Sequence, residues 1–128
     1  MNDQRKEERR KLMAFTPVYN SSKRTLLGYI GDLTLKGVMV IGKNPVETKQ
    51  QITLIVELSN DLYEIASDNF TIPARVAWCR QDAESSQDFN IGLEFTEINP
   101  QNKLIIQAIL ERYHFRHHMS DPEFKEGK

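Results

Sequence analysis

The stretch GDLTLKGVMVIG, residues 31–42, brings together residue types that could bind a polar ligand: Asp32, Thr34 and Gly37. A carboxylate accepts hydrogen bonds from paired N–H donors, such as those of an arginine or of a guanine base. A hydroxyl adds a donor and an acceptor, and glycine lets the backbone approach a ligand closely or adopt a positive φ. The alternative is a plain hairpin, because aspartate and glycine are also good turn formers. The residues alone leave both interpretations open.

A second candidate is the basic run Arg9-Arg10-Lys11, which lies just before the first predicted strand. A guanidinium can clamp a phosphate through two hydrogen bonds, or pair with the O6 and N7 acceptors of guanine. Adjacent arginines on an extended chain point in different directions, so they could hold two parts of one ligand. The alternative is a solvated charge run balanced by Glu7 and Glu8.

Candidates for catalysis or metal binding have weaker support. Cys79 lies in a predicted strand and is interpreted as a small core residue. His114, His117 and His118 lack the accompanying ligands of a zinc site, and the acids of residues 59–69 belong to a polar loop. No phosphate-binding loop, dinucleotide fingerprint or nucleophile elbow is present. The sequence therefore predicts a non-enzymatic protein with no catalytic residues, metal site or cofactor.

The elements that position these residues are mostly strands. Six segments have the β-favouring composition or the two-residue alternation of strands, and they cover residues 14–20, 25–30, 38–42, 51–58, 70–79 and 89–95. In the fifth segment the alternation places Trp78 on the same face as Val76, with Cys79 on the other face. Residues 20–23 are predicted to form a turn, and Pro17 indicates a strand start or an edge strand.

One amphipathic helix follows the strands. Asn99 is a favoured N-cap and Pro100 is tolerated at the first helical position. An apolar stripe then recurs at helical spacing, formed by Ile105, Ile106, Ile109, Leu110 and Tyr113. We expect this helix to fray around residues 114–118. The predicted fold is mainly β, a six-stranded antiparallel β-barrel or curled sheet with a C-terminal amphipathic α-helix.

Length and composition limit the class of protein. The 128 residues suffice for one domain, and the net charge of -1 argues against DNA or RNA as a partner. A single cysteine, a charged N-terminus and the lack of a long apolar run predict a cytoplasmic protein that does not insert into a membrane. We expect a flexible basic arm at residues 1–12, a folded unit at 13–118 and a disordered tail at 119–128.

Taken in order, the segments ERRKL, GDLTLKGVMV, RVAWCR and FNIGLEF resemble a PilZ domain, from about Glu8 to Phe115. The second signature of that family, (D/N)xSxxG, is similar to Asp32, Thr34 and Gly37, with threonine in place of serine. The first signature, RxxxR, is matched less closely. With Arg9 and Arg10 on its leading arginines, its last arginine falls on Ala14. The pair Arg5 and Arg9 also spells RxxxR, further upstream.

The resemblance implies a receptor for cyclic di-GMP, a bacterial second messenger, that passes its signal to an unidentified protein effector. In this family the arginines of the arm bind phosphate and guanine, and the (D/N)xSxxG segment closes on the nucleotide from the barrel. The implied ligand-binding residues are therefore Arg9, Arg10, Asp32, Thr34 and Gly37. Because Ala14 replaces an arginine, the alternative is a degenerate adaptor that does not bind nucleotide and acts only through protein contacts.

Overall fold

The computed structural model describes residues 11–12, 16–58 and 68–115. Their elements, in chain order, are β1 (Lys11–Leu12), β2 (Pro17–Asn20), β3 (Thr25–Leu33), β4 (Gly37–Gly42), β5 (Gln51–Glu57), β6 (Asn69–Gln81), β7 (Phe89–Phe95), α2 (Pro100–Arg112) and β8 (Tyr113–His114). The segments expected to form a flexible arm at 1–12 and a tail at 119–128 lie outside the described residues, apart from β1.

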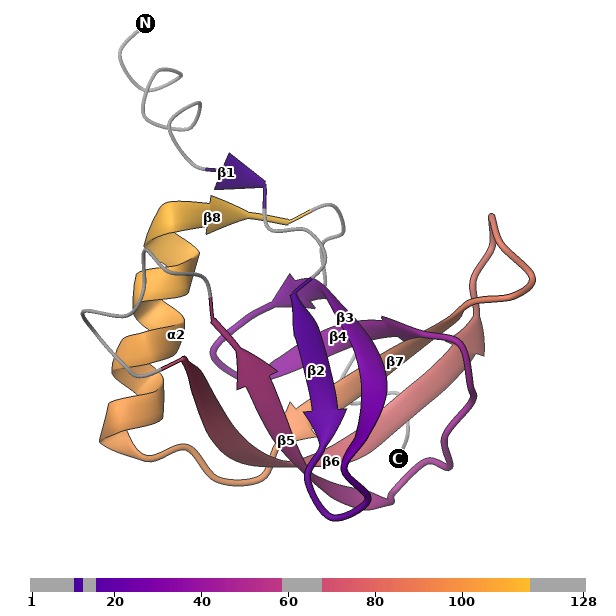
Figure 1. The fold of residues 1–128 in the computed structure, drawn as a ribbon, viewed down its shortest axis with the longest axis horizontal. Coiled ribbons are helices and arrows are strands. Elements are labelled where there is room, and N and C mark those ends of the chain that lie inside the picture. Colours follow the sequence, from indigo (N-terminus) through magenta and orange to yellow (C-terminus); the bar gives the residue numbers. More distant parts are fainter. Residues whose placement is uncertain (1–10, 13–15, 59–67, 116–128) are drawn as a thin grey trace, which may run out of the picture.

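Strands β2 to β7 form a closed barrel in the order β2-β3-β4-β7-β6-β5, with antiparallel pairing throughout (Figure 1). The barrel closes where β2 pairs with β5, with Val18 opposite Val56. Pro17 is the first residue of β2, so its missing N–H costs little pairing there. The prediction of a six-stranded antiparallel barrel with one C-terminal helix is confirmed.

The core follows from the alternation of the strands. In β5, Ile52, Leu54 and Val56 are buried, and the residues between them lie at the surface or are only partly buried. In β7, Ile91 and Leu93 are completely buried. These side chains meet inside the barrel in one hydrophobic cluster. Its burial is the main favourable contribution to folding, because apolar area removed from water stabilises by roughly 25 cal/mol per Å².

Of the three register shifts in the described ladders, two are β-bulges that change which face the residues near the candidate site occupy. In β3 the bulge lies between Ile30 and Asp32, so Gly31 is the extra residue. In β6 the bulge lies between Val76 and Trp78, so Ala77 is the extra residue. The second bulge makes the predicted face of Trp78 wrong. Trp78 packs in a separate cluster on the outer side of the sheet, whereas Cys79 packs against the main core.

Helix α2 packs beside the barrel and adds its apolar stripe to the main core (Figure 1). The predicted cap is confirmed, because the Asn99 side chain accepts a hydrogen bond from the N–H of Asn102 at 2.7 Å. The buried Asn102 amide in turn donates to the Thr71 carbonyl of β6 at 2.9 Å. The expected fraying at 114–118 is wrong for His114. The helix ends at Arg112 and the chain becomes extended in β8.

Strand β8 forms a separate two-stranded sheet with β1. The pairing is parallel, with Lys11 opposite Tyr113 and Leu12 opposite His114. In Figure 1 this small sheet lies at the end of α2, away from the barrel strands. The segment before the first barrel strand therefore pairs with the segment that follows helix α2.

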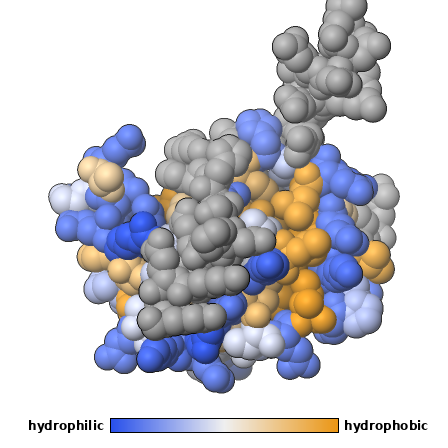
Figure 2. All heavy atoms as spheres, turned by 180° about the vertical axis from the view of Figure 1, so that it is seen from behind, coloured by the Kyte–Doolittle hydropathy of each residue, from blue (hydrophilic) through white to orange (hydrophobic). Residues whose placement is uncertain are grey.

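The surface is mixed in character. On the face turned away from the viewer in Figure 1, hydrophobic residues gather in a band with hydrophilic residues on both sides (Figure 2). Four large hydrophobic side chains in the described part of the chain are well exposed, namely Leu26, Tyr29, Leu35 and Leu104. Among the helices of the described residues, none has the length and hydrophobicity to span a bilayer.

Candidate functional site

The turn between β3 and β4 is formed by Thr34, Leu35, Lys36 and Gly37. The Thr34 N–H donates to the Gly37 carbonyl at 2.9 Å. The Thr34 Oγ1 accepts hydrogen bonds from the N–H of Lys36 at 3.1 Å and the N–H of Gly37 at 3.2 Å. The hydroxyl therefore holds the turn backbone in shape, as serine and threonine side chains commonly do in turns.

The same turn is attached to the neighbouring strand β7. The N–H of Phe95 donates to the Lys36 carbonyl at 2.9 Å, and Gly37 lies opposite Glu94 in the ladder. Gly37 is buried and is not among the described glycines with a positive φ. The sequence suggested two roles for this glycine, a positive φ or a close approach of the backbone to a ligand. Gly37 does not have the positive φ.

Asp32 lies within β3 rather than in the turn, directly after the bulge at Gly31. The residue is 95% buried, and its Oδ1 accepts a hydrogen bond from the N–H of Leu33 at 2.9 Å. It lies opposite Met39, whose side chain belongs to the cluster outside the main core. Since neighbouring residues of a strand alternate in direction and Leu33 is in the main core, Asp32 occupies the outer side of the barrel.

Asp32, Met39, Gly92 and Trp78 follow one another across four adjacent strands, β3, β4, β7 and β6. We call this series the outer row. Adjacent strands are about 4.8 Å apart, so the row spans roughly 14 Å of the barrel surface. Met39, Ala77 and Trp78 form the buried cluster on this side, with Ile41 packed against it.

Trp78 has close neighbours in this cluster. A Cβ placed on Gly92 would come within 2.2 Å of Trp78 Cε2, so only glycine leaves room for the indole at this point. The Arg80 guanidinium lies over the indole, with Cζ 4.3 Å from the ring centroid, a geometry typical of a cation–π contact. Within the described part of the chain, Trp78 Nε1 is buried and has no hydrogen-bond partner.

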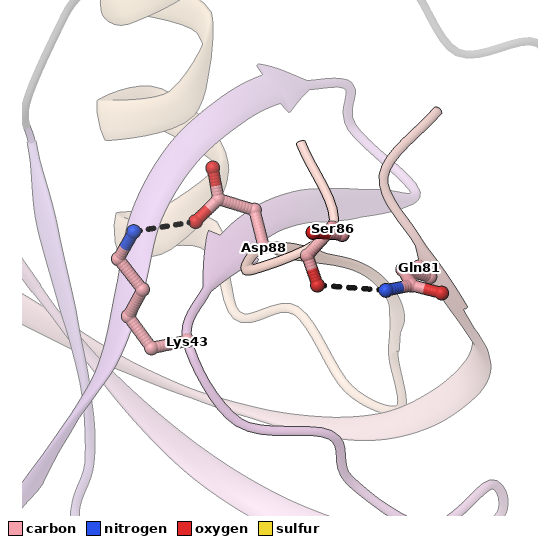
Figure 3. Close-up of polar contacts among 4 residues, drawn as sticks. All are labelled: Lys43, Gln81, Ser86 and Asp88. Carbon is pink, nitrogen blue, oxygen red and sulfur yellow. Dashed lines mark hydrogen bonds and ion pairs between the residues drawn. The ribbon is translucent and has the colours of Figure 1, made fainter. Parts of the chain in front are cut away.

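The loop that joins β6 to β7 borders Arg80 and is held by polar contacts. The Lys43 Nζ donates to Asp88 Oδ1 at 2.7 Å, and the Gln81 side-chain amide donates to the Ser86 carbonyl at 2.7 Å (Figure 3). The hydrogen bond from Lys43 is the main cause that lowers the pKa of Asp88 below its ordinary value. These contacts fix the loop beside the strand end that carries Arg80.

The structure thus brings together three of the predicted site residues, Asp32, Thr34 and Gly37, at one end of the β3–β4 hairpin. Arg9, Arg10 and Ala14 lie outside the described residues, as does the alternative Arg5.

Sequence reasoning missed Trp78, Gly92 and Arg80 as members of this surface. The signal for them was present in two places. Trp78 and Arg80 are two residues apart in one strand, so they share a face. Gly92 interrupts an apolar strand, which often marks a position where another group approaches the backbone closely. Among the described residues, no group of three or more histidine, cysteine or acidic side chains could hold a metal ion.

Comparison with known proteins agrees with this architecture. The model of the PilZ domain family matches residues 3–112, which includes every strand of the barrel and all of helix α2. A comparison with curated proteins gave no match. The match covers most of the chain and extends through both segments that resemble the family signatures. The chain therefore belongs to the PilZ domain family.

Proposed function

We propose that this protein is a non-enzymatic receptor for cyclic di-GMP. The observation that carries the proposal is the position of Asp32, which lies on the outer side of the barrel beside a turn fixed by Thr34 and Gly37. The carboxylate accepts hydrogen bonds from the N1–H and N2–H groups of a guanine. The turn next to Asp32 is held in shape by its own hydrogen bonds, which keeps this end of the hairpin rigid. Membership of the PilZ family supports this choice of ligand.

The arm supplies the cationic half of the proposed site. Arg9 and Arg10 bind the phosphates and a guanine of the dinucleotide, and this contact orders the arm against the barrel. Part of the binding free energy is consumed in this ordering, as in other order–disorder switches. Because β1 follows Arg10 directly and pairs with β8, the ordered arm starts next to the end of α2.

The signal then passes to another protein in the cytoplasm. A ligand that orders the arm changes the surface presented near β1, β8 and the end of α2, and an effector that binds only the ordered form responds to the nucleotide. The effector is selective because it binds the form with the ordered arm more tightly than the form without it. A nucleotide that bound both forms equally would transmit no signal.

A second candidate function is an adaptor that binds only protein. The feature that favours it is Ala14, which stands where the family signature has its last arginine. A charge-assisted hydrogen bond is worth about 1.5–3 kcal/mol, so the loss of that arginine weakens binding roughly 10- to 150-fold. The receptor reading requires that the remaining groups still bind the nucleotide at cellular concentrations.

Isothermal titration with cyclic di-GMP separates the two candidates. We expect heat of binding with the unmodified protein and at least about tenfold weaker binding for Arg10→Ala, because that variant loses charged hydrogen bonds. The matched control is Arg24→Gln, an exposed arginine in the β2–β3 turn, which should bind like the unmodified protein. No heat with the unmodified protein would favour the adaptor.

A chemical-shift titration locates the site in the same experiment. Receptor binding should move the amide resonances of Arg9, Arg10 and Asp32 and leave those of the β2–β3 turn in place. If Arg9, Arg10 and Asp32 stay unmoved in a large excess of cyclic di-GMP, the receptor proposal is wrong.

A further inference from the structure

We propose that the outer face of strands β2, β3 and β5 binds a second copy of this chain and forms a weak dimer with two-fold symmetry. Five residues make up this surface, which we call the β2 patch: Pro17, Tyr19, Leu26, Tyr29 and Ile55. None of them belongs to the candidate nucleotide site. The proposal therefore goes beyond the proposed function and does not depend on it.

The register of the three strands brings the β2 patch together. Tyr19 lies opposite Leu26 in one ladder and opposite Ile55 in the other, and Pro17 lies opposite Tyr29. Residues directly opposite each other in a sheet point to the same face. The register shift in the β2–β3 ladder places Leu26 and Tyr29, which are three residues apart, on that face together. In Figure 1 the three strands lie side by side at the front of the barrel.

The β2 patch faces away from the core and is exposed. The residues that alternate with its members in β2 and β5 belong to the main core, namely Val18, Leu54 and Val56. Leu26 is 46% exposed and Tyr29 is 39% exposed, and the other three members are partly buried. A single exposed hydrophobic residue needs no explanation, but several that adjoin one another are typical of an interaction surface.

Opposite charges border the β2 patch at its two ends. At one end the β2–β3 turn carries Lys23 and Arg24, which are exposed and have no salt-bridge partner among the described residues. At the other end Glu57, also exposed, is the last residue of β5 and lies beside the start of β2. The pKa of Tyr19 is raised, first by burial and then by the nearby Glu57 carboxylate. Glu57 therefore borders the patch directly.

This arrangement of charges is self-complementary under a two-fold rotation. When the axis runs across the strands, the second copy lies face to face with the first and its strands run in the opposite direction. Lys23 and Arg24 of each copy then lie near Glu57 of the other. An axis along the strands would instead bring the two basic turns together, and like charges repel. The charges therefore select the dimer with opposed strands.

The size of the β2 patch predicts weak association. Three strands about 4.8 Å apart and about six residues long cover roughly 15 Å by 20 Å, or roughly 300 Å². This is well below the roughly 800 Å² that each partner buries in a stable complex. The net charge of -1 gives little repulsion between copies. We expect a dissociation constant between about 10 μM and 1 mM, which is typical of transient contacts.

Sedimentation equilibrium of the full chain without nucleotide, from about 10 μM to about 1 mM, measures this association. Leu26→Glu should weaken it at least about tenfold, because the contact would bury a charge among apolar side chains. Leu104→Glu is the matched control. It makes the same change at an exposed leucine of α2, 59% exposed, and should associate like the unmodified protein. Circular dichroism checks that both variants keep the fold.

A charge exchange tests the orientation of the two copies. Glu57→Lys alone should weaken association roughly fivefold or more, because like charges then meet at both ends of the contact. Lys23→Glu combined with Arg24→Asp should have a similar effect. Aspartate is chosen at position 24 because Arg24 has a φ of 55°, which aspartate tolerates well. All three substitutions together should restore association to within about threefold of the unmodified protein.

The outcomes are distinct from those of the nucleotide titrations. If the unmodified protein is monomeric at about 1 mM, the proposal is wrong and the β2 patch is left for a different protein. Equal weakening by Leu26→Glu and Leu104→Glu would place the contact elsewhere and overturn it as well. If the charge exchange does not restore association, the arrangement with opposed strands is wrong. None of these results changes the receptor proposal, which is tested by the binding of cyclic di-GMP.

Discussion

The indole of Trp78 lies against the backbone of Gly92, so closely that a single added carbon would overlap the ring. A Cβ on Gly92 would come within 2.2 Å of Trp78 Cε2 and 2.4 Å of Nε1. The ring is the end of a flexible side chain, yet Trp78 is 93% buried and packed with Met39 and Ala77. It therefore has little room in which to move away.

Gly92→Ala should destabilise the protein by about 1–3 kcal/mol, because the ring or the strand must shift to admit the methyl group. Equilibrium urea unfolding measures the change. The control is a double-mutant cycle with Trp78→Leu, since a smaller side chain at position 78 leaves space for the alanine. An equal cost of Gly92→Ala in both backgrounds would contradict the proposed clash.

This relationship also shows where sequence reasoning stops. Composition and two-residue alternation predicted the six strands, most clearly in β5, where buried residues alternate with residues that face outward. They could not predict the bulge at Ala77, because an inserted residue leaves no signature in hydrophobicity when alanine fits either side. One extra residue reversed the faces of Trp78 and Cys79. The outer cluster was hidden from the sequence for that reason.

The sequence indicated which hairpin residues could bind a ligand, which stays a prediction, but it did not indicate their geometry. The types and spacing of Asp32, Thr34 and Gly37 were sufficient to select them, and the resemblance to PilZ domains supplied a role. Their local conformation depended on tertiary pairing. Asp32 lies inside β3 because β4 continues the ladder up to Leu33, and the Thr34 hydroxyl bonds to the turn backbone.

Thr34→Val should weaken the hairpin, because valine has a similar shape but accepts no hydrogen bond. The N–H groups of Lys36 and Gly37 lose their acceptor, for a cost of about 1–2 kcal/mol in the free energy of unfolding. Thr34→Ser keeps the hydroxyl and should lie within about 0.5 kcal/mol of the unmodified protein. Chemical denaturation of the three proteins provides the comparison. Equal stability of the valine and serine variants would show that these hydrogen bonds contribute nothing.

The contact between Lys43 and Asp88 predicts a change of stability in acid. Hydrogen bonding from Lys43 lowers the pKa of Asp88 in the folded protein, so this carboxylate stabilises the fold above its unfolded pKa of about 4. The contribution is lost as the pH falls through the lower folded value. Lys43→Met should therefore be slightly less stable than the unmodified protein at pH 7, with the gap closing in acid.

Thermal unfolding at several pH values measures this gap. The effect is small and should shrink with added salt, because the Lys43 side chain is 72% exposed. Lys103→Met, which removes an exposed lysine from α2, is the control for the loss of one positive charge. A gap for Lys43→Met that stays constant from pH 7 to below the folded pKa would show that the Asp88 contact is not its source.

Ala14→Arg tests how the first signature aligns with this chain. If Arg10 and position 14 form the RxxxR pair, the new guanidinium restores charged hydrogen bonds and binding of cyclic di-GMP should tighten roughly tenfold or more. Ala14→Lys separates the effect of the planar fork from that of charge alone, and should give a smaller gain. If Ala14→Arg leaves affinity unchanged while the unmodified protein binds, the pair is instead Arg5 and Arg9. In that case Arg5→Ala should abolish most of the affinity, because it removes one of the two arginines that hold the dinucleotide.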